Sequence, residues 1–270
     1  MKNVLITGHN GFLGKALLKK LKNKKLNIFG ISRGINPSLE CVNYVGDVTN
    51  LNTLHNIMSS KNIDTVIHLA GKAIVSECEE NPFDAFKING LGTAAVLEAS
   101  RITHVKKIIS VETDKVYGVQ KIMPTPETSK LNAGTPYEFS KALSSKISDF
   151  YRNYYKMNII SVRPANLIGG EDHNTTRVMP NAFKHILEGK SIPIYEEAKK
   201  MTRDFIYVSD VAEALYILCI NNNKHCKYNL SPNKKINVFE FAKLINKTLN
   251  CKLPPKIIKK NINFKEIPHQ

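Results

Sequence analysis

The sequence predicts an α/β fold, built on a doubly wound parallel sheet with a smaller carboxyl-terminal lobe. Three observations support this prediction. Short β-rich runs alternate with helical periods in the first part of the chain, a glycine-rich turn follows the first run, and the alternation ends after Pro164. With 270 residues, 42% of them hydrophobic, the chain has enough apolar side chains to fill a core.

Six runs have the composition of strands in a buried parallel sheet. In chain order they are NVLIT (3–7), NIFGIS (27–32), CVNYV (41–45), TVIHLA (65–70), KIISV (107–111) and NIISVRP (158–164). Helical patterns lie between them, and the clearest extends from Tyr137 to Tyr155 after the helix-start pair Thr135-Pro136. One stripe of this amphipathic helix consists of Phe139, Leu143, Ile147, Phe150 and Tyr154.

A glycine-rich segment, TGHNGFLG, connects the first strand to the first helix. Gly8 permits a tight turn, Gly11 lets the backbone approach a pyrophosphate, and Gly14 lets the helix pack close to the sheet. The spacing Gly-x-x-Gly-x-x-Gly differs from Gly-x-Gly-x-x-Gly, but its place between a first strand and a first helix is typical of dinucleotide binding. The sequence therefore predicts a Rossmann-type domain.

Two further helices are predicted after Pro164, in MPNAFKHILEG (179–189) and VSDVAEALYILC (208–219), among loops and short strands. We assign residues 1–165 to the dinucleotide-binding domain, with residues 204–220 packed on it. Residues 166–270 are expected to form a small substrate-binding lobe at the carboxyl edge of the sheet, where open α/β folds bind their ligands.

The end of the second strand bears on the choice of cofactor. An acidic residue there accepts the ribose hydroxyls of NAD, but this chain has Ile31-Ser32-Arg33. Because an arginine can pair with a 2′-phosphate, Ser32 and Arg33 favour NADP slightly over NAD; the alternative is an exposed loop arginine. Asp47, in GDVT at the end of the third strand, is a candidate acceptor for the adenine amino group.

Tyr137 and Lys141, in PYEFSKA, lie one helical turn apart on one face of the longest predicted helix. A tyrosine hydroxyl with a pKa near ~10 is a poor base at neutral pH, and a cation held close to it lowers that pKa. The pair is therefore a candidate for proton transfer. The stretch SVETDKVYG (110–118), at the end of a predicted strand, adds a threonine, an acid and a base.

Charge and cysteine content narrow the class of protein. Thirty-nine Lys and Arg against 23 Asp and Glu give a net charge of +16, spread as single lysines and short pairs. Nucleic-acid binding normally needs a clustered basic stripe or a known module, so we expect a solvated cationic surface that attracts phosphorylated small molecules. The five cysteines form no Cys-x-x-Cys pair, so we expect no metal and a reducing, cytoplasmic location. No run approaches membrane-spanning length.

An ordered set of motifs spans nearly the whole chain. It consists of TGHNGFLG, GDVT, HLAG (68–71), NGLGT (89–93), TDKVYG (113–118), YEFSK (137–141), RPANLIGG (163–170) and RDFIYVSD (203–210). In these motifs the chain resembles the extended short-chain dehydrogenase/reductases that act on nucleotide sugars. The Asp-Lys pair after Thr113 is most similar to the 4,6-dehydratases, in particular the CDP-glucose 4,6-dehydratase type, whereas epimerases usually carry small residues there.

The resemblance implies a role for each motif residue. Thr113 and Tyr137 would hold the sugar's 4-hydroxyl, with Tyr137 and Lys141 serving oxidation at C4. Asp114 would be the acid and Lys115 the base that eliminate water across C5 and C6. Asn166 and Arg203 would contact the substrate's phosphates. The cofactor would be held by Gly8, Gly11, Phe12, Leu13, Gly14, Ser32, Arg33, Asp47, Val48, Leu69, Ala70, Tyr137 and Lys141, and the enzyme would be a homodimer.

Several features depart from the resemblance. Many dehydratases of the family have glutamate as the base where this chain has Lys115. Glu112 stands in place of a small hydroxyl residue, and because alternate strand residues point to opposite sides, it could face away from the reacting groups. Similar sequences continue through a further helix beyond EIPHQ, so we expect a shortened lobe. Two alternatives stay open: a 4-epimerase or 4-keto reductase, and a non-catalytic dinucleotide-binding sensor.

Overall fold

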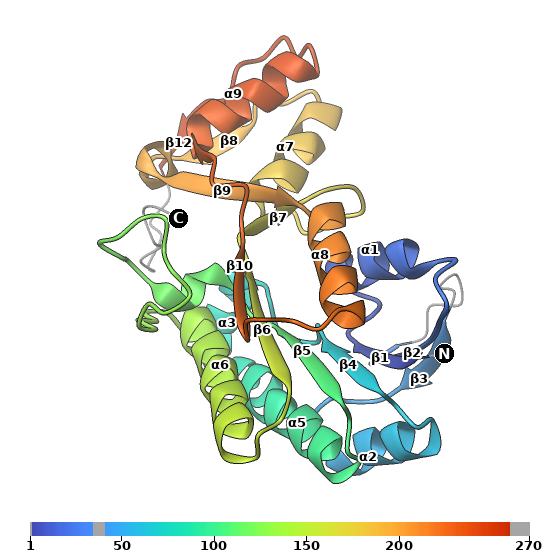
Figure 1. Cartoon of the computed structure of the whole chain (residues 1–270). Helices are drawn as coiled ribbons and strands as arrows, with labels where there is room; N and C mark the ends of the chain where they lie inside the picture. The colour runs from blue at the N-terminus through green and yellow to red at the C-terminus, as the bar shows by residue number, and fades with distance from the viewer. Residues whose placement is uncertain (1, 35–40, 260–270) are drawn as a thin grey trace.

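The computed structural model describes residues 2–34 and 41–259, and its largest unit is a parallel seven-stranded sheet (Figure 1). The strands lie in the order β10-β6-β5-β4-β1-β2-β3, and every neighbouring pair is parallel. Their bounds are β1 Lys2–Thr7, β2 Leu26–Ser32, β3 Val42–Val45, β4 Thr65–His68, β5 Lys107–Val111, β6 Ile159–Pro164 and β10 Lys227–Leu230. The predicted α/β fold and its six strands are confirmed.

Helices cover both faces of this sheet (Figure 1). On one face α1 (Phe12–Leu21) packs with α8 (Val208–Ile220) over side chains of β1, β4 and β6. On the other face lie α2 (Leu51–Ser60), α5 (Gly92–Ile102) and α6 (Pro136–Tyr154). The short helices α3 (Val75–Glu80) and α4 (Pro82–Ala85) and the π-helical turn η1 (Phe86–Leu91) lead into α5. A 3₁₀ turn, η2 (Asp114–Tyr117), follows β5.

The carboxyl-terminal lobe has its own small core. It contains the three-stranded sheet β11-β9-β7 and the strand pair β12-β8. The elements are β7 (Asn166–Ile168), α7 (Val178–Leu187), β8 (Pro193–Tyr195), η3 (Glu197–Lys200), β9 (Thr202–Tyr207), β11 (Lys235–Asn237), α9 (Val238–Thr248) and β12 (Lys256–Ile258). Strand β10 pairs with β6 in the large sheet, although the predicted domain boundaries place residues 227–230 in the lobe.

Helix α6 is amphipathic, but mainly polar side chains occupy its buried side. Its apolar stripe points only partly to the core: Phe139 is 52% exposed, Phe150 53% and Tyr154 70%, whereas Leu143 and Ile147 are half-buried and Ile147 packs against the core. The buried side carries polar groups instead, namely Tyr137, Glu138, Ser140, Lys141, Ser144, Ser145 and Ser148. A capping box between Thr135 and Glu138 starts the helix, as the Thr135-Pro136 signal predicts. The face that positions chemistry is therefore the polar one.

Candidate active site

The glycine-rich turn lies between β1 and α1 at the carboxyl edge of the sheet. Gly8 has a φ of +73°, and a Cβ there would stand 2.7 Å from the Ala70 nitrogen. A Cβ on Gly14 would stand 2.5 Å from the Gly8 carbonyl oxygen, so both positions need glycine. Gly11 is the N-cap of α1, and no side chain caps this helix start. Its free backbone N–H groups fit a diphosphate.

Side chains at the end of β2 form a polar corner beside this turn. The Asn10 amide donates to the Ser32 hydroxyl at 2.8 Å and to the Gly34 carbonyl at 2.6 Å. The Asn10 Oδ1 oxygen is buried and has no hydrogen-bond partner among the described residues. Arg33 is exposed, and Asp47 accepts from the Thr49 backbone and hydroxyl at 2.8 and 2.9 Å. Those two bonds, with the nearby Arg33 charge, lower the pKa of Asp47.

The other predicted cofactor residues line the same turn or the strands beside it. Leu69 and Ala70 follow β4, where their backbone N–H groups donate to the Thr7 carbonyl at 3.1 Å and the Thr7 hydroxyl at 3.2 Å. Strand β4 ends at His68, two residues before the predicted end. Phe12 and Leu13 pack at the start of α1, and Val48 is buried against α5.

Tyr137 and Lys141 lie one turn apart on the buried face of α6, at 8% and 7% exposure. Thr113 hydrogen-bonds with the Tyr137 side chain, and the Lys141 ammonium donates to the Val111 carbonyl at 3.4 Å. Burial, together with the Asp114 charge, raises the pKa of Tyr137 to about 12 despite the Thr113 bond. The expected lowering of this pKa by Lys141 is therefore wrong for the structure as it stands, since burial dominates and the ammonium turns to Val111.

Asp114 begins η2, directly after Thr113. Burial raises its pKa to about 6, although the charges of Lys115 and Arg203 and a hydrogen bond from Thr113 act in the opposite direction. The Thr113 hydroxyl donates to Asp114 Oδ1 at 3.3 Å and accepts from the Lys115 backbone at 3.3 Å. The turn thus places a partly protonated carboxyl beside the tyrosine, with Lys115 next along the chain.

Asn89, in η1, ties the neighbouring segments together. Its side chain accepts from the Lys72 backbone at 2.8 Å and donates to the Lys72 carbonyl at 3.0 Å and to the Ser140 hydroxyl at 2.8 Å. Lys72 also lies 4.0 Å from Glu77 and 3.7 Å from Asp84. Asn89 therefore bridges the loop after β4 to α6.

The carboxyl-terminal lobe contributes three further polar side chains, which are Asn166, Arg203 and Arg177. The Asn166 amide donates to the Asp204 backbone carbonyl at 3.2 Å, and Arg203 is buried. Arg177, which sequence reasoning missed, stacks 5.7 Å from the centre of the Phe12 ring and lowers the pKa of Tyr137 through its charge. No local motif marks Arg177; only the folded lobe brings it to the glycine turn.

Comparison with known protein families shows which family this chain belongs to. Residues 4–231 match the model of the NAD dependent epimerase/dehydratase family. The chain belongs to this family. The match covers the Rossmann domain, β10 and every predicted site residue.

Two curated relatives and one solved structure illustrate the family. The chain is 27% identical to a trifunctional UDP-glucose 4,6-dehydratase/UDP-4-keto-6-deoxy-D-glucose 3,5-epimerase/UDP-4-keto-L-rhamnose-reductase of Arabidopsis thaliana, over 92% of this chain but only 40% of that protein. It is 28% identical to the dTDP-glucose 4,6-dehydratase of Haemophilus influenzae, over 95% of this chain and 82% of that one.

The solved structure is the UDP-glucose 4-epimerase of Thermotoga maritima with UDP-glucose. It superposes with a TM-score of 0.89 at 24% identity, over 99% of this chain and 88% of the epimerase. At that identity the agreement is one of fold. Dehydratases and epimerases of the family therefore share this architecture, and the reaction depends on individual side chains.

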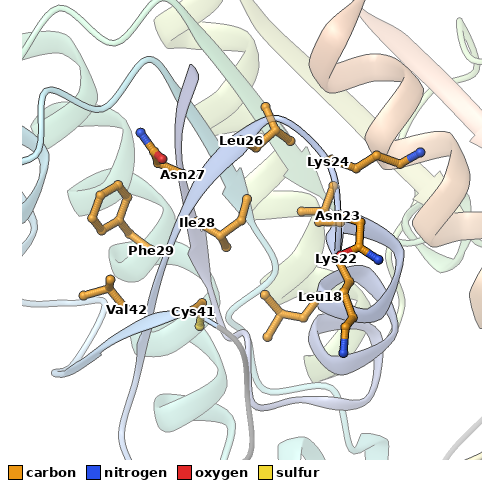
Figure 2. A pocket seen from close by; sticks show the side chains of 11 residues that line it. Leu18, Lys22, Asn23, Lys24, Leu26, Asn27, Ile28, Phe29, Cys41 and Val42 are labelled. Atoms are coloured by element: carbon orange, nitrogen blue, oxygen red, sulfur yellow. The ribbon is translucent and has the colours of Figure 1, made fainter. Parts of the chain in front are cut away.

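Other features of the described chain lie apart from this site. A hollow of about 430 Å³ lies beside α1 and β2 and shares no residue with the site; it is lined by Leu18, Leu21, Lys22, Asn23, Lys24, Leu26, Asn27, Ile28, Phe29, Cys41 and Val42 (Figure 2). Within residues 2–34 and 41–259, no three His, Cys, Asp or Glu side chains gather as a metal site would need. In the same residues, no helix has the length and apolar character of a membrane span.

Proposed function

We propose that this chain is a nucleotide-sugar 4,6-dehydratase, which converts an NDP-hexose to an NDP-4-keto-6-deoxyhexose. The observation that carries the proposal is Asp114, a carboxyl with a pKa of about 6 set beside Thr113 and Tyr137. At neutral pH about a tenth of the protein molecules have a carboxyl with that pKa protonated. Such a protonated carboxyl can serve as the acid that the departing 6-hydroxyl requires. A simple 4-epimerase has no use for it.

The residues then divide the reaction between them. Thr113 and Tyr137 hold the 4-hydroxyl, and Tyr137 as phenolate takes its proton when C4 is oxidised to a ketone. The ketone acidifies the C5 hydrogen, which Lys115 removes as base while Asp114 protonates the departing 6-hydroxyl, so that water leaves. A dinucleotide held at the glycine turn by Gly8, Gly11 and Gly14 would supply the hydride acceptor for C4 and the hydride source for C6. C5 regains a proton that comes from solvent.

Two arginines support binding of the substrate diphosphate. Arg177 lies against Phe12 at the glycine turn, and the Arg203 charge reaches Asp114. We assign the diphosphate to these guanidinium groups and to Asn166, because a forked donor matches phosphate oxygens. The overall charge of +16 favours approach of such an anion.

We propose NADP as the preferred cofactor. Arg33 supports it, since this arginine is exposed beside the end of β2, where a guanidinium can pair with a 2′-phosphate. Fluorescence titration should give a lower Kd for NADP⁺ than for NAD⁺. Arg33→Ala should weaken NADP⁺ binding about tenfold and leave NAD⁺ binding unchanged. Equal Kd values for the two dinucleotides in the wild type would contradict this preference.

We also propose a homodimer that works in the cytoplasm. Exposed apolar side chains gather on α4, η1, α5 and α6, of which α5 and α6 lie side by side (Figure 1); they include Phe83, Leu91, Ile102, Phe139, Phe150 and Tyr154. Such a face suits a second copy of the same face, because a two-fold interface is self-complementary. The five cysteines are free thiols, which fits a reducing compartment.

Mass spectrometry of products in heavy water tests the reaction. The wild-type chain is incubated with a panel of CDP-, UDP-, dTDP- and GDP-hexoses, and a 4-keto-6-deoxy product with one deuterium at C5 is expected. Asp114→Asn should lower its formation by about 10²-fold or more. Glu188→Gln, which changes an exposed carboxylate on the lobe, should leave the rate unchanged. A product without deuterium at C5 would refute the elimination.

A 4-epimerase is the second candidate, because the chain is also 27% identical to the UDP-glucose 4-epimerase of Yersinia enterocolitica over 95% of its length. It predicts an unchanged hexose composition with inversion at C4, and near-normal turnover of Asp114→Asn. The non-catalytic sensor predicts dinucleotide binding without turnover of any sugar in the panel.

A further inference from the structure

Glu112 is a buried carboxylate that the proposed reaction leaves without a role. It follows β5, and its side chain reaches Ser145 on the buried face of α6. Its Oε2 oxygen accepts from Arg163 Nε at 2.8 Å and from the Ser145 hydroxyl of α6. The side chains of Glu112 and Arg163 are 0% and 1% exposed. Oε1, the second carboxylate oxygen, is buried without a hydrogen-bond partner among the described residues.

This carboxylate is joined to both elements that hold Lys141. The Lys141 ammonium donates at 3.4 Å to the carbonyl of Val111, the residue before Glu112. Ser145, which donates to Glu112, lies one turn after Lys141 on α6. A change at Glu112 therefore acts on the strand end and on the helix turn that together position the ammonium.

Two buried cations lie close to Glu112. Lys141 and Arg163 bring two positive charges, and Glu112 brings one negative charge. Burial lowers the pKa of Lys141, and the charge of Glu112 is the largest effect that opposes the lowering.

Other titratable groups face the pair from the surrounding elements. They are Cys78 of α3, His68 of β4, Asp114 of η2 and Arg177 before α7. Burial lowers the pKa of His68 to about 3, so it is neutral, and burial raises that of Cys78 to about 11, so its thiol is neutral too. Glu112 is thus the anion that acts on Lys141 across the pH range of a rate measurement.

We propose that Glu112 is a positioning residue for the redox pair: it neutralises Arg163, fixes the strand end and the helix turn that position the Lys141 ammonium, and keeps that ammonium charged. The proposal rests on the proposed function only in that Tyr137 and Lys141 oxidise C4. It holds equally for a dehydratase and for an epimerase, because both begin with that step.

The test is the pH profile of C4 oxidation, followed by absorbance of the reduced dinucleotide in a single turnover of the full chain. We expect the rate of C4 oxidation to fall at alkaline pH when Lys141 loses its proton, and we call this fall the alkaline limb of the profile. In Glu112→Gln the alkaline limb should move to lower pH by about one unit, and oxidation at pH values above the limb should be about tenfold slower. KM for the sugar nucleotide should stay unchanged. Glu112→Asp, which keeps the charge, should restore the limb. A limb at wild-type pH in a folded Glu112→Gln protein would overturn the proposal.

A second measurement does not depend on activity. In the protein without cofactor, the free energy of unfolding should rise with pH as buried Lys141 loses its proton, because the unfolded state then binds more protons. In Glu112→Gln this rise should begin at lower pH. A rise that begins at the same pH in both proteins would overturn the proposal independently of any reaction.

Two further variants separate positioning from loss of an ion pair. Asp149→Asn removes a carboxylate that pairs with Lys227 and Arg152, two turns after Lys141 on α6, and should leave the limb in place. The double variant Glu112→Gln/Arg163→Met also removes the buried arginine that pairs with Glu112, and keeps the test open should the single variant fail to fold. Its limb should still lie at lower pH. If the wild type oxidises C4 but makes no 4-keto-6-deoxy sugar, the dehydratase proposal is refuted, and the proposal for Glu112 can still be tested by C4 oxidation.

Discussion

The two faces of α6 differ in a way opposite to most surface helices. The face turned to the sheet carries Tyr137, Lys141 and a row of serines, whereas the face turned outward carries Phe139, Phe150 and Tyr154. Three of the inward serines are hydrogen-bonded: Ser140 donates to the Tyr137 carbonyl and Ser144 to the Asn89 carbonyl, each at 2.7 Å, and Ser145 donates to Glu112. Buried hydroxyls cost little when they are bonded in this way. The Ser148 hydroxyl is buried without a partner among the described residues.

The difference shows that periodicity identifies a stripe but does not say which side is buried. A polar inner face builds the site, and an apolar outer face is left for a partner. Each of the following predictions tests one part of this division, from the largest expected effect to the smallest.

The inner face should be the catalytic one. Tyr137→Phe removes the hydroxyl that takes the C4 proton, and C4 oxidation should fall by about 10³-fold in a single-turnover assay. Tyr154→Phe removes the same atom from a ring that is 70% exposed on the outer face, and its rate should equal that of the wild type. If Tyr137→Phe keeps more than a tenth of the wild-type rate, the inner face of α6 does not supply the group that takes the C4 proton.

The buried environment around Asp114, which faces Tyr137, should make stability depend on pH. Its folded pKa of about 6 exceeds the reference value of 3.8, so the stability of the neutral carboxyl is fully present below pH 3.8 and is lost as pH rises through about 6. The wild type should therefore lose on the order of 2 kcal/mol relative to Asp114→Asn between pH 4 and pH 7.

Urea unfolding at each pH measures this difference. Asp210→Asn, at an exposed site in the first turn of α8, serves as the control and should keep a constant difference from the wild type. A parallel pair of stability curves for Asp114→Asn and the wild type would mean that burial does not raise the pKa of Asp114.

The outer face should control assembly. The Phe150 ring stacks on Tyr154 at 5.4 Å and packs edge-on against Tyr155 at 5.9 Å, so a charge placed there disrupts a cluster rather than a single contact. Phe150→Glu should weaken the dimer about tenfold or more in sedimentation equilibrium. Phe183→Glu on α7 adds the same charge to the lobe and should leave the dimer intact. A wild-type chain that sediments as a monomer at every concentration would contradict the proposed interface.

The sequence predicts those parts of the fold that depend on local sequence patterns. β-branched runs mark six strands of the large sheet, the glycine turn marks the connection from β1 to α1, and the Thr135-Pro136 pair marks the start of α6. Strand β10, KYNL, carries too few apolar residues to be recognised, and it becomes a strand because β6 offers an open edge.

Long-range contacts account for what the sequence does not show. Arg177 is separated from Phe12 by most of the Rossmann domain, and Glu112 meets Arg163 from the neighbouring strand. Tyr117 packs in a small buried cluster with Val116 and Ala142, and its hydroxyl also bonds Asn229 at 2.8 Å and Arg163 at 2.7 Å. Such pairs depend on how strands are ordered in the sheet, which residue spacing along the chain does not contain.

The smallest effect should come from the start of α6, which sets where both faces begin. The Thr135 hydroxyl accepts from the Glu138 backbone at 3.3 Å, and the Glu138 carboxylate accepts from the Thr135 backbone at 3.2 Å. Thr135→Ala removes one half of this box and should lower the free energy of unfolding by about 1 kcal/mol, whereas Thr135→Ser should keep it. Both variants should retain the Tyr137-dependent rate, because burial of the polar face holds the helix in its orientation. A large loss of rate in Thr135→Ala with little loss of stability would instead mean that the cap, and not the buried serines, orients the inner face.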